Sequence, residues 1–185
     1  MSGARRGLAL GLFALSLTVS CAAPTASGDP RVLALDDEGL RVSVPGDWDA
    51  IRSSDVGFGS GRVLFYLSNQ ALEADCLQAG NESRCTFPVG ALEDGGVLVL
   101  WATSGCAGVA CELPSDDRLL ISGREAAKAV DTGACEEIGA TEEDVYAVTV
   151  TPQRVDWIVV CAREPTAAEQ ATVATILGAV EWRTP

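Results

Sequence analysis

Cysteine is the residue type whose number and spacing bear most directly on chemistry in this sequence. The chain of 185 residues has seven cysteines, and Cys21 stands well apart from the other six. These six contain no C-x-x-C spacing, and the chain has no histidine to complete a zinc site. An even number of cysteines without such spacing indicates disulfide bonds, which are typical of exported proteins. The six are Cys76, Cys85, Cys106, Cys111, Cys135 and Cys161.

Spacing favours two local bridges among these cysteines, although six cysteines permit about 15 pairings. The pair 76–85 brackets a polar segment, and the pair 106–111 brackets the short segment AGVA. The pair 135–161 is then left to join across strands. Bridges that close short loops hold those loops in shape and add about 2 to 3 kcal/mol each.

The absence of histidine also limits the catalytic chemistry open to this chain. Histidine is the commonest general base and the usual partner of a nucleophilic serine, so a Ser-His-Asp triad is excluded. Lys128 could act as a base for Ser122 or Thr132, but no S-x-x-K spacing supports that role, and a solvated lysine is the commoner situation. We therefore predict no catalytic and no cofactor-binding residues.

Acidic residues occur in four short runs, which the sequence places in turns. None matches the D-x-D-x-D-G calcium loop, so solvated loops are favoured over metal sites. Two carboxylates across a groove could still serve a glycosidase-like hydrolase, which is the enzymatic alternative. The runs are Asp36-Asp37-Glu38, Asp116-Asp117, Glu136-Glu137 and Glu142-Glu143-Asp144.

The formal net charge of −13 comes from 26 acidic and 13 basic residues. Nucleic acids and anionic lipid surfaces are recognised by clustered Lys and Arg, so neither is expected as a partner by surface charge. A soluble, solvated surface explains the acidity, and attraction of cations or basic partners is the sharper alternative.

The N-terminus has the pattern of an export signal. Arg5 and Arg6 precede an uncharged, largely apolar stretch at 7–19 that is too short for a permanent membrane anchor. The residues that follow, LTVSC at 17–21, resemble the lipobox of bacterial lipoproteins, with the usual leucine displaced by one position. This resemblance implies cleavage before Cys21 and a diacylglyceryl group on its sulfur. An ordinary signal peptide, cleaved after residue 22 or 23, is the alternative.

These features predict the organisation of the chain. Residues 1–20 are a signal peptide, 21–30 a lipid anchor and flexible linker, and 31–185 a single domain. The linker AAPTASGDP reaches about 30 Å when extended. We expect the domain on the outer face of the cytoplasmic membrane, held by the two acyl chains of Cys21.

Strand patterns dominate the domain. Leu40, Val42 and Val44 alternate with polar residues. In a second strand, Val63, Phe65 and Leu67 should share one face. The run VLVLW at 97–101 is apolar on both faces and predicts a central strand that is covered on each side. Alternation over 146–150 and 155–161, with a turn between them, predicts a hairpin.

One helix is expected near the C-terminus. Thr166 and Glu169 have the spacing of a capping box, and apolar residues then recur at helical spacing up to a stop near Gly178. A last short strand should include Val180 and Trp182, and 122–130 fits a strand better than a helix. The sequence therefore predicts an α+β fold: a mostly antiparallel sheet of six or seven strands, a C-terminal helix packed on it and disulfide-stapled loops.

The strand and turn LRVSVPGDW at 40–48 resemble the opening of PsbP/Mog1-like domains, where a strand is followed by Pro-x-x-Trp. A terminal helix running into a final strand, as at 166–182, is similar. The segments FYLSNQAL at 65–72 and GGVLVLW at 95–101, with the cysteine layout, resemble uncharacterised secreted proteins of actinobacteria. The resemblance implies a fold and no catalytic role.

Together these patterns favour a non-enzymatic binding or interaction domain of the cell envelope. Its partner would be an envelope protein or a small ligand, and its alternatives are a carboxylate-dependent hydrolase or a stabilising subunit of an envelope complex. Trp48, Trp101 and Trp157 could line a ligand groove, but core positions are favoured because two of them lie in apolar strand runs.

Overall fold

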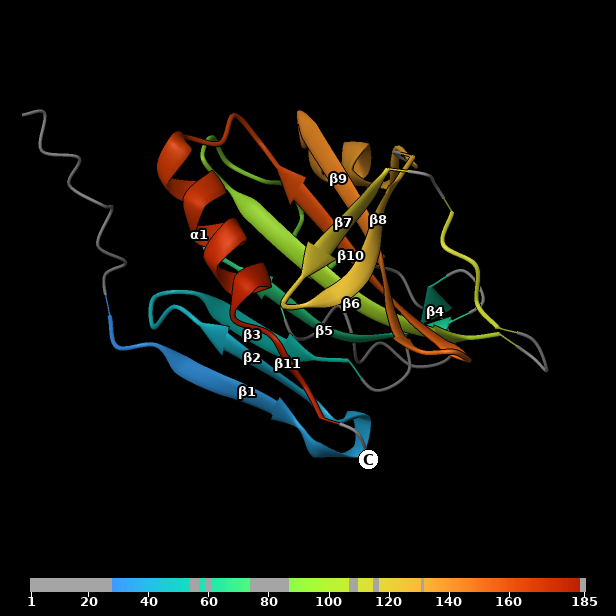
Figure 1. The fold of residues 1–185 in the computed structure, drawn as a ribbon. Coiled ribbons are helices and arrows are strands. Elements are labelled where there is room, and N and C mark those ends of the chain that lie inside the picture. Colours follow the sequence, from blue (N-terminus) through green and yellow to red (C-terminus); the bar gives the residue numbers. More distant parts are fainter. Residues whose placement is uncertain are drawn as a thin grey trace, which may run out of the picture.

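The computed structural model describes residues 28–53, 57–58, 61–73, 87–106, 110–114, 117–130 and 132–183. Their fold is α+β, as the sequence predicts: two antiparallel sheets with one α-helix near the C-terminal end (Figure 1). Cys21, the signal and linker segments up to residue 27, and the pair 76–85 lie outside the described residues.

The larger sheet has eight strands: seven follow the order β3-β5-β6-β10-β9-β8-β7, and the short β4 pairs with β5. Every neighbouring pair is antiparallel. The strands are β3 (Asp49–Arg52), β4 (Gly57–Phe58), β5 (Gly61–Ser68), β6 (Val97–Gly105), β7 (Arg118–Ile121), β8 (Arg124–Ala129), β9 (Glu142–Thr151) and β10 (Arg154–Ala162). The predicted hairpin is β9–β10, and the ambiguous segment 122–130 contains strand β8.

Strand β6 lies inside this sheet and is buried on both faces, which confirms the prediction for the VLVLW run. Val97, Val99 and Trp101 belong to one buried cluster, and Leu98 and Leu100 belong to another on the opposite face. The first cluster is covered by the α-helix and the small sheet, and the second packs against Phe87 to Leu92 and Ile138. An apolar residue at every position is needed because neither face meets water.

The smaller sheet joins the two ends of the domain. It consists of β1 (Arg31–Leu35), β2 (Leu40–Val44) and β11 (Glu181–Trp182), in the order β1-β2-β11. Figure 1 shows blue β1 and β2 beside red β11, although well over a hundred residues separate them in sequence. The last short strand is thus confirmed, and its place in a second sheet is an addition to what the sequence predicts.

Helix α1 (Ala167–Gly178) begins and ends where its sequence signals place it. Thr166 Oγ1 accepts a hydrogen bond from Ala168 N at 3.2 Å, and Glu169 Oε2 accepts one from Thr166 N at 2.7 Å. These two bonds satisfy orphan amides of the first turn, as in a capping box. Ile176 packs into the core between the sheets and the helix.

Two disulfide bonds lie in the described residues and confirm two of the expected pairings. Cys106 pairs with Cys111, and Cys135 pairs with Cys161, with Cα atoms 5.4 Å apart in each bridge. Cys135 lies on a 3-10 helix, η3 (Ala134–Ile138), so the second bridge joins a helical turn to β10 rather than two strands. The expected pair 76–85 lies outside the described residues.

Candidate functional site

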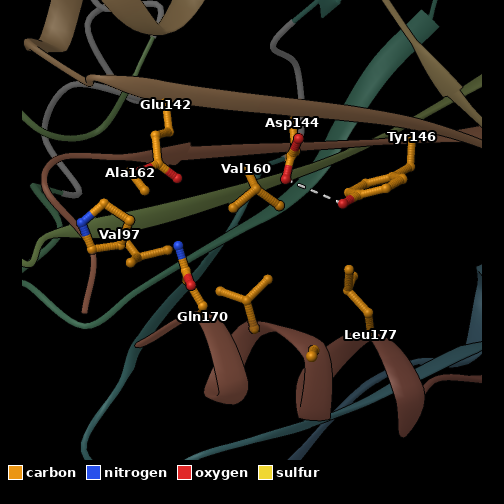
Figure 2. A pocket seen from close by; sticks show the side chains of 11 residues that line it. Val97, Glu142, Asp144, Tyr146, Val160, Ala162, Gln170 and Leu177 are labelled. Atoms are coloured by element: carbon orange, nitrogen blue, oxygen red, sulfur yellow. Dashed lines mark hydrogen bonds between the residues drawn. The ribbon is translucent and has the colours of Figure 1, made fainter. Parts of the chain in front are cut away.

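A groove lies between helix α1 and the larger sheet, on the face that also holds the main core (Figure 2). Its volume is about 260 Å³. Strand β9 forms one wall, α1 forms the other, and β10 with the start of β6 forms the floor. The lining residues are Val97, Glu142, Asp144, Tyr146, Val160, Ala162, Pro165, Gln170, Val173, Ala174 and Leu177.

The β9 wall is a row of three polar side chains. Glu142, Asp144 and Tyr146 alternate along the strand, and alternate residues of a strand point to the same face. Figure 2 shows all three side chains directed towards the helix. The prediction that 142–144 lies in a turn is therefore wrong: these acids are paired in register with residues 160–162 of β10, which extends β9 through them.

The α1 wall is mainly apolar. Gln170, Val173, Ala174 and Leu177 have the i, i+3, i+4 and i+7 spacing that places side chains on one face of a helix. The apolar stripe predicted from sequence therefore divides in two: Ile176 is buried in the core, whereas Val173 and Leu177 remain half-buried beside the groove. The space between helix and sheet stays open because Ala174 has no side-chain atom beyond Cβ that could reach the sheet.

A second depression of about 200 Å³ continues the groove towards the hairpin β7–β8. It shares Tyr146, Ala174 and Leu177 with the first and adds Leu119 and Leu120 to the lining. The far end is tied to the helix by Ser122: its hydroxyl donates to the Leu177 carbonyl at 2.9 Å and accepts from the Val180 amide at 3.1 Å. The lining of this end of the groove is mainly apolar.

The two carboxylates of the groove differ in their surroundings. Asp144 forms an ion pair with Lys128 of β8 and accepts a hydrogen bond from the Tyr146 hydroxyl at 3.2 Å. The hydrogen bond to Asp144 and the attraction of its charge raise the pKa of the Lys128 ammonium. The pKa of the Tyr146 phenol is also raised, mainly by burial and next by the nearby charge of Asp144. Glu142 is exposed at the groove rim, and its carboxylate has no hydrogen-bond or ion-pair partner among the described residues.

The other residues considered from the sequence do not gather at one site. Trp48 and Trp101 are buried in the main core, as expected. Trp157 packs against the cluster on the opposite face of the sheet, with its indole N–H donating to Ser104 Oγ at 3.0 Å. The three tryptophans therefore line no common groove. Lys128 is engaged with Asp144 rather than poised beside a nucleophile.

Of the remaining acidic runs, Asp36–Glu38 forms the 3-10 helix η1, and the glutamates at 136–137 lie on η3. Asp117, the described residue of the run 116–117, lies directly before β7. Within the described part of the chain, no group of three or more His, Cys, Asp or Glu side chains is placed to hold a metal ion. No helix in that part is long and apolar enough to cross a membrane.

A buried polar cluster that sequence reasoning missed joins the two sheets. Asp156 is fully buried, and its Oδ2 accepts hydrogen bonds from the indole N–H groups of Trp101 and Trp182, each at 3.1 Å. Arg154 Nε donates to Asp156 Oδ1 at 3.0 Å, and the same guanidinium reaches the Glu38 carbonyl at 2.9 Å. The available signal was the strand period, which places Asp156 on the same face as Ile158 and Val160.

Comparison with known proteins gives no further guide, because no protein-family model, curated protein or solved structure matches this chain. The groove is the feature of the described residues that best fits a ligand. It is concave and largely apolar, with a few polar groups along one wall, and this combination is typical of small-molecule sites.

Proposed function

We propose that this chain is a lipid-anchored extracytoplasmic protein whose folded part, residues 31–185, binds a small, largely apolar ligand in the groove between α1 and β9. The observation that supports binding is the groove itself. Its apolar floor and helix wall would release water on contact with an apolar ligand, which supplies the favourable free energy of binding. Its polar row would orient that ligand.

The size of the groove favours a small ligand over a protein partner. Volumes of about 260 Å³ and 200 Å³ for its two parts lie below or near the lower end of the range for drug-sized ligands. Large exposed apolar residues, by contrast, are scattered over three segments of the described chain: Val32 on β1, Leu120 on β7, and Val130 just after β8. Such isolated residues support a stabilising-subunit role less well than one continuous patch would.

The anchor is proposed from the sequence. Cys21 follows the charged and apolar segments of an export signal, and the linker up to residue 30 would place the domain close to the outer face of the cytoplasmic membrane. The disulfide bonds at 106–111 and 135–161 are compatible with that location, because bridges persist in oxidising compartments. A ligand held at this face could come from the membrane or from the medium.

The geometry of the groove supports hydrolysis less well than binding. Glycosidases of the two-carboxylate type place their acids on both sides of the scissile bond. Here Glu142 and Asp144 stand on the same strand and the same wall, and the opposite wall offers Gln170 as its polar group. A hydrolase role would therefore need a second acid from elsewhere in the chain.

Photolabelling of the full-length chain in its membrane tests the binding proposal. The probe is an eight-carbon alcohol carrying an alkyl diazirine, and labelled positions are mapped on the reduced tryptic peptides 129–154 and 164–183, which contain β9 and α1. We expect labelling on both peptides and at least a fivefold loss in Ala174→Trp, whose indole would fill the groove. Ala171→Trp is the matched control, because Ala171 is exposed on the same helix and lies outside the lining. Equal labelling in the two variants would refute groove binding.

The anchor is tested separately by the intact mass of the protein from the membrane fraction. A mature chain that begins at Cys21 with a diacylglyceryl adduct is expected. A soluble chain that begins at residue 23 or 24 without an adduct would refute the anchor and leave the binding proposal in place.

A further inference from the structure

The groove has a polar end and an apolar end. Figure 2 shows Glu142 and Gln170 facing each other from β9 and α1 at one end, and Tyr146 with Leu177 at the other. Beyond Leu177 the lining continues into the apolar depression beside β7. The helix face from residue 170 to 177 is about 10 Å long at 1.5 Å per residue, which suits a short alkyl chain laid along the helix.

The charge of the groove is negative and is only partly compensated. Its lining includes two carboxylates and neither lysine nor arginine. Lys128 reaches in from β8 to pair with Asp144, and the Tyr146 hydroxyl fills a further acceptor site of that carboxylate. Glu142, at the polar end, is left without an ionic partner among the described residues. The net charge of −13 for the whole chain adds a field of the same sign.

From this juxtaposition we infer that the groove takes a single-chain amphiphile whose head group bears one positive charge, with the head at Glu142 and the chain between α1 and the sheet. The inference rests on the proposed binding function and names its ligand class. An ammonium head has three donors and no acceptor, so it can bond the Glu142 carboxylate and the Gln170 amide oxygen at once. A carboxylate head in the same place would face Glu142 and be repelled.

The head group should contribute selectivity more than strength. Glu142 is exposed at the rim, and ion pairs in such positions are worth at most about 1 kcal/mol, which corresponds to about a fivefold preference. Asp144 should contribute little to this preference, because its charge is already paired with Lys128. The substitution that matters is therefore at Glu142.

The test is competition against the photoreactive octanol by n-octylamine, n-octanol and octanoate at pH 7. The three competitors share one chain length and differ in head charge. The full-length chain is held in phosphatidylcholine nanodiscs. We expect n-octylamine to compete about fivefold better than n-octanol, and octanoate to compete worse than n-octanol. In Glu142→Gln the amine-to-alcohol ratio should fall to about 1, whereas Glu142→Lys should reverse the order in favour of octanoate.

Glu137→Gln is the matched control, because it removes the same charge from η3, on the opposite face of the sheet. Ratios compared between variants cancel the different partitioning of the competitors into lipid. The inference would be overturned by an unchanged amine preference in Glu142→Gln, or by octanoate being the best competitor of the original chain. In either case the binding proposal would stand if Ala174→Trp still reduced the labelling. Labelling insensitive to Ala174→Trp would remove both.

Discussion

Replacing Asp156 with asparagine tests what holds the two sheets together. The carboxylate is fully buried and accepts from Trp101 on β6, from Trp182 on β11 and from Arg154 on its own strand. Trp182 belongs to the smaller sheet, and Arg154 also bonds the η1 turn between β1 and β2 through Glu38. This one side chain thus links the larger sheet to both ends of the domain.

The cost of Asp156→Asn can be derived from these contacts. An amide has one acceptor oxygen and a donor NH₂ group, so at least one of the three donors loses its acceptor and meets another donor. Removing one partner of a buried ion pair costs about 3 to 5 kcal/mol. Arg154 keeps an ion pair with Glu38 at 3.2 Å, and its side chain is 21% exposed. We therefore expect the lower end, a loss of about 3 kcal/mol in the free energy of unfolding.

Urea unfolding of the full-length chain, followed by tryptophan fluorescence, measures this loss. A melting temperature lower by roughly 6 to 12 °C should accompany it in a domain of this size. Trp182→Phe is the graded control, because it removes one indole donor and leaves the charge pair intact, which should cost about 1 kcal/mol. The reasoning is refuted if Asp156→Asn costs less than about 1 kcal/mol or no more than Trp182→Phe.

Three further predictions concern stability. Burial raises the pKa of Tyr66 to about 12, so the folded state keeps a proton that the unfolded state releases above pH of about 10. The free energy of unfolding should therefore fall by roughly 3 kcal/mol between these pH values, and phenolate absorbance that reports full ionisation below pH of about 11 in the folded protein would contradict this. Replacing Cys135 and Cys161 by alanine should cost about 3.5 kcal/mol in urea unfolding, against about 2 kcal/mol for the shorter bridge 106–111; equal losses would contradict the loop-length argument. Thr166→Ala should cost about 1 kcal/mol by removing the helix cap, and an unchanged unfolding midpoint would show that the cap adds nothing.

The elements that sequence predicts well are those whose signals are local. The run at 97–101 has apolar residues at consecutive positions, and burial on both faces is the consequence of that pattern. Helix α1 has its start encoded by Thr166 and Glu169 and its end near Gly178. The hairpin β9–β10 is a period-two pattern with a turn at 152–153. Each of these signals lies within a few residues of the structure it determines.

The smaller sheet and the groove have no such local signal. Strand β11 is two residues long and pairs with β2 from the other end of the domain, so only tertiary packing can reveal this pairing. The groove brings 142–146 to face 170–177, and these segments line one groove only because the chain after β10 returns as α1 on this face of the sheet. The acidic run at 142–144 is misleading in the sequence, because acids are common in turns, whereas here pairing with β10 extends the strand through them.

The contacts at both ends of α1 argue that the groove is formed before any ligand arrives. The capping box determines where the helix begins, and Ser122 bonds the Leu177 carbonyl and the Val180 amide just where the helix ends. Two residues after Val180, the indole of Trp182 is held by the buried carboxylate of Asp156. Helix and sheet are thus joined at the C-terminal end of α1, beside a space that the small side chain of Ala174 leaves open. A ligand that enters this space has little ordering cost to meet, and this favours binding even to a groove of modest size.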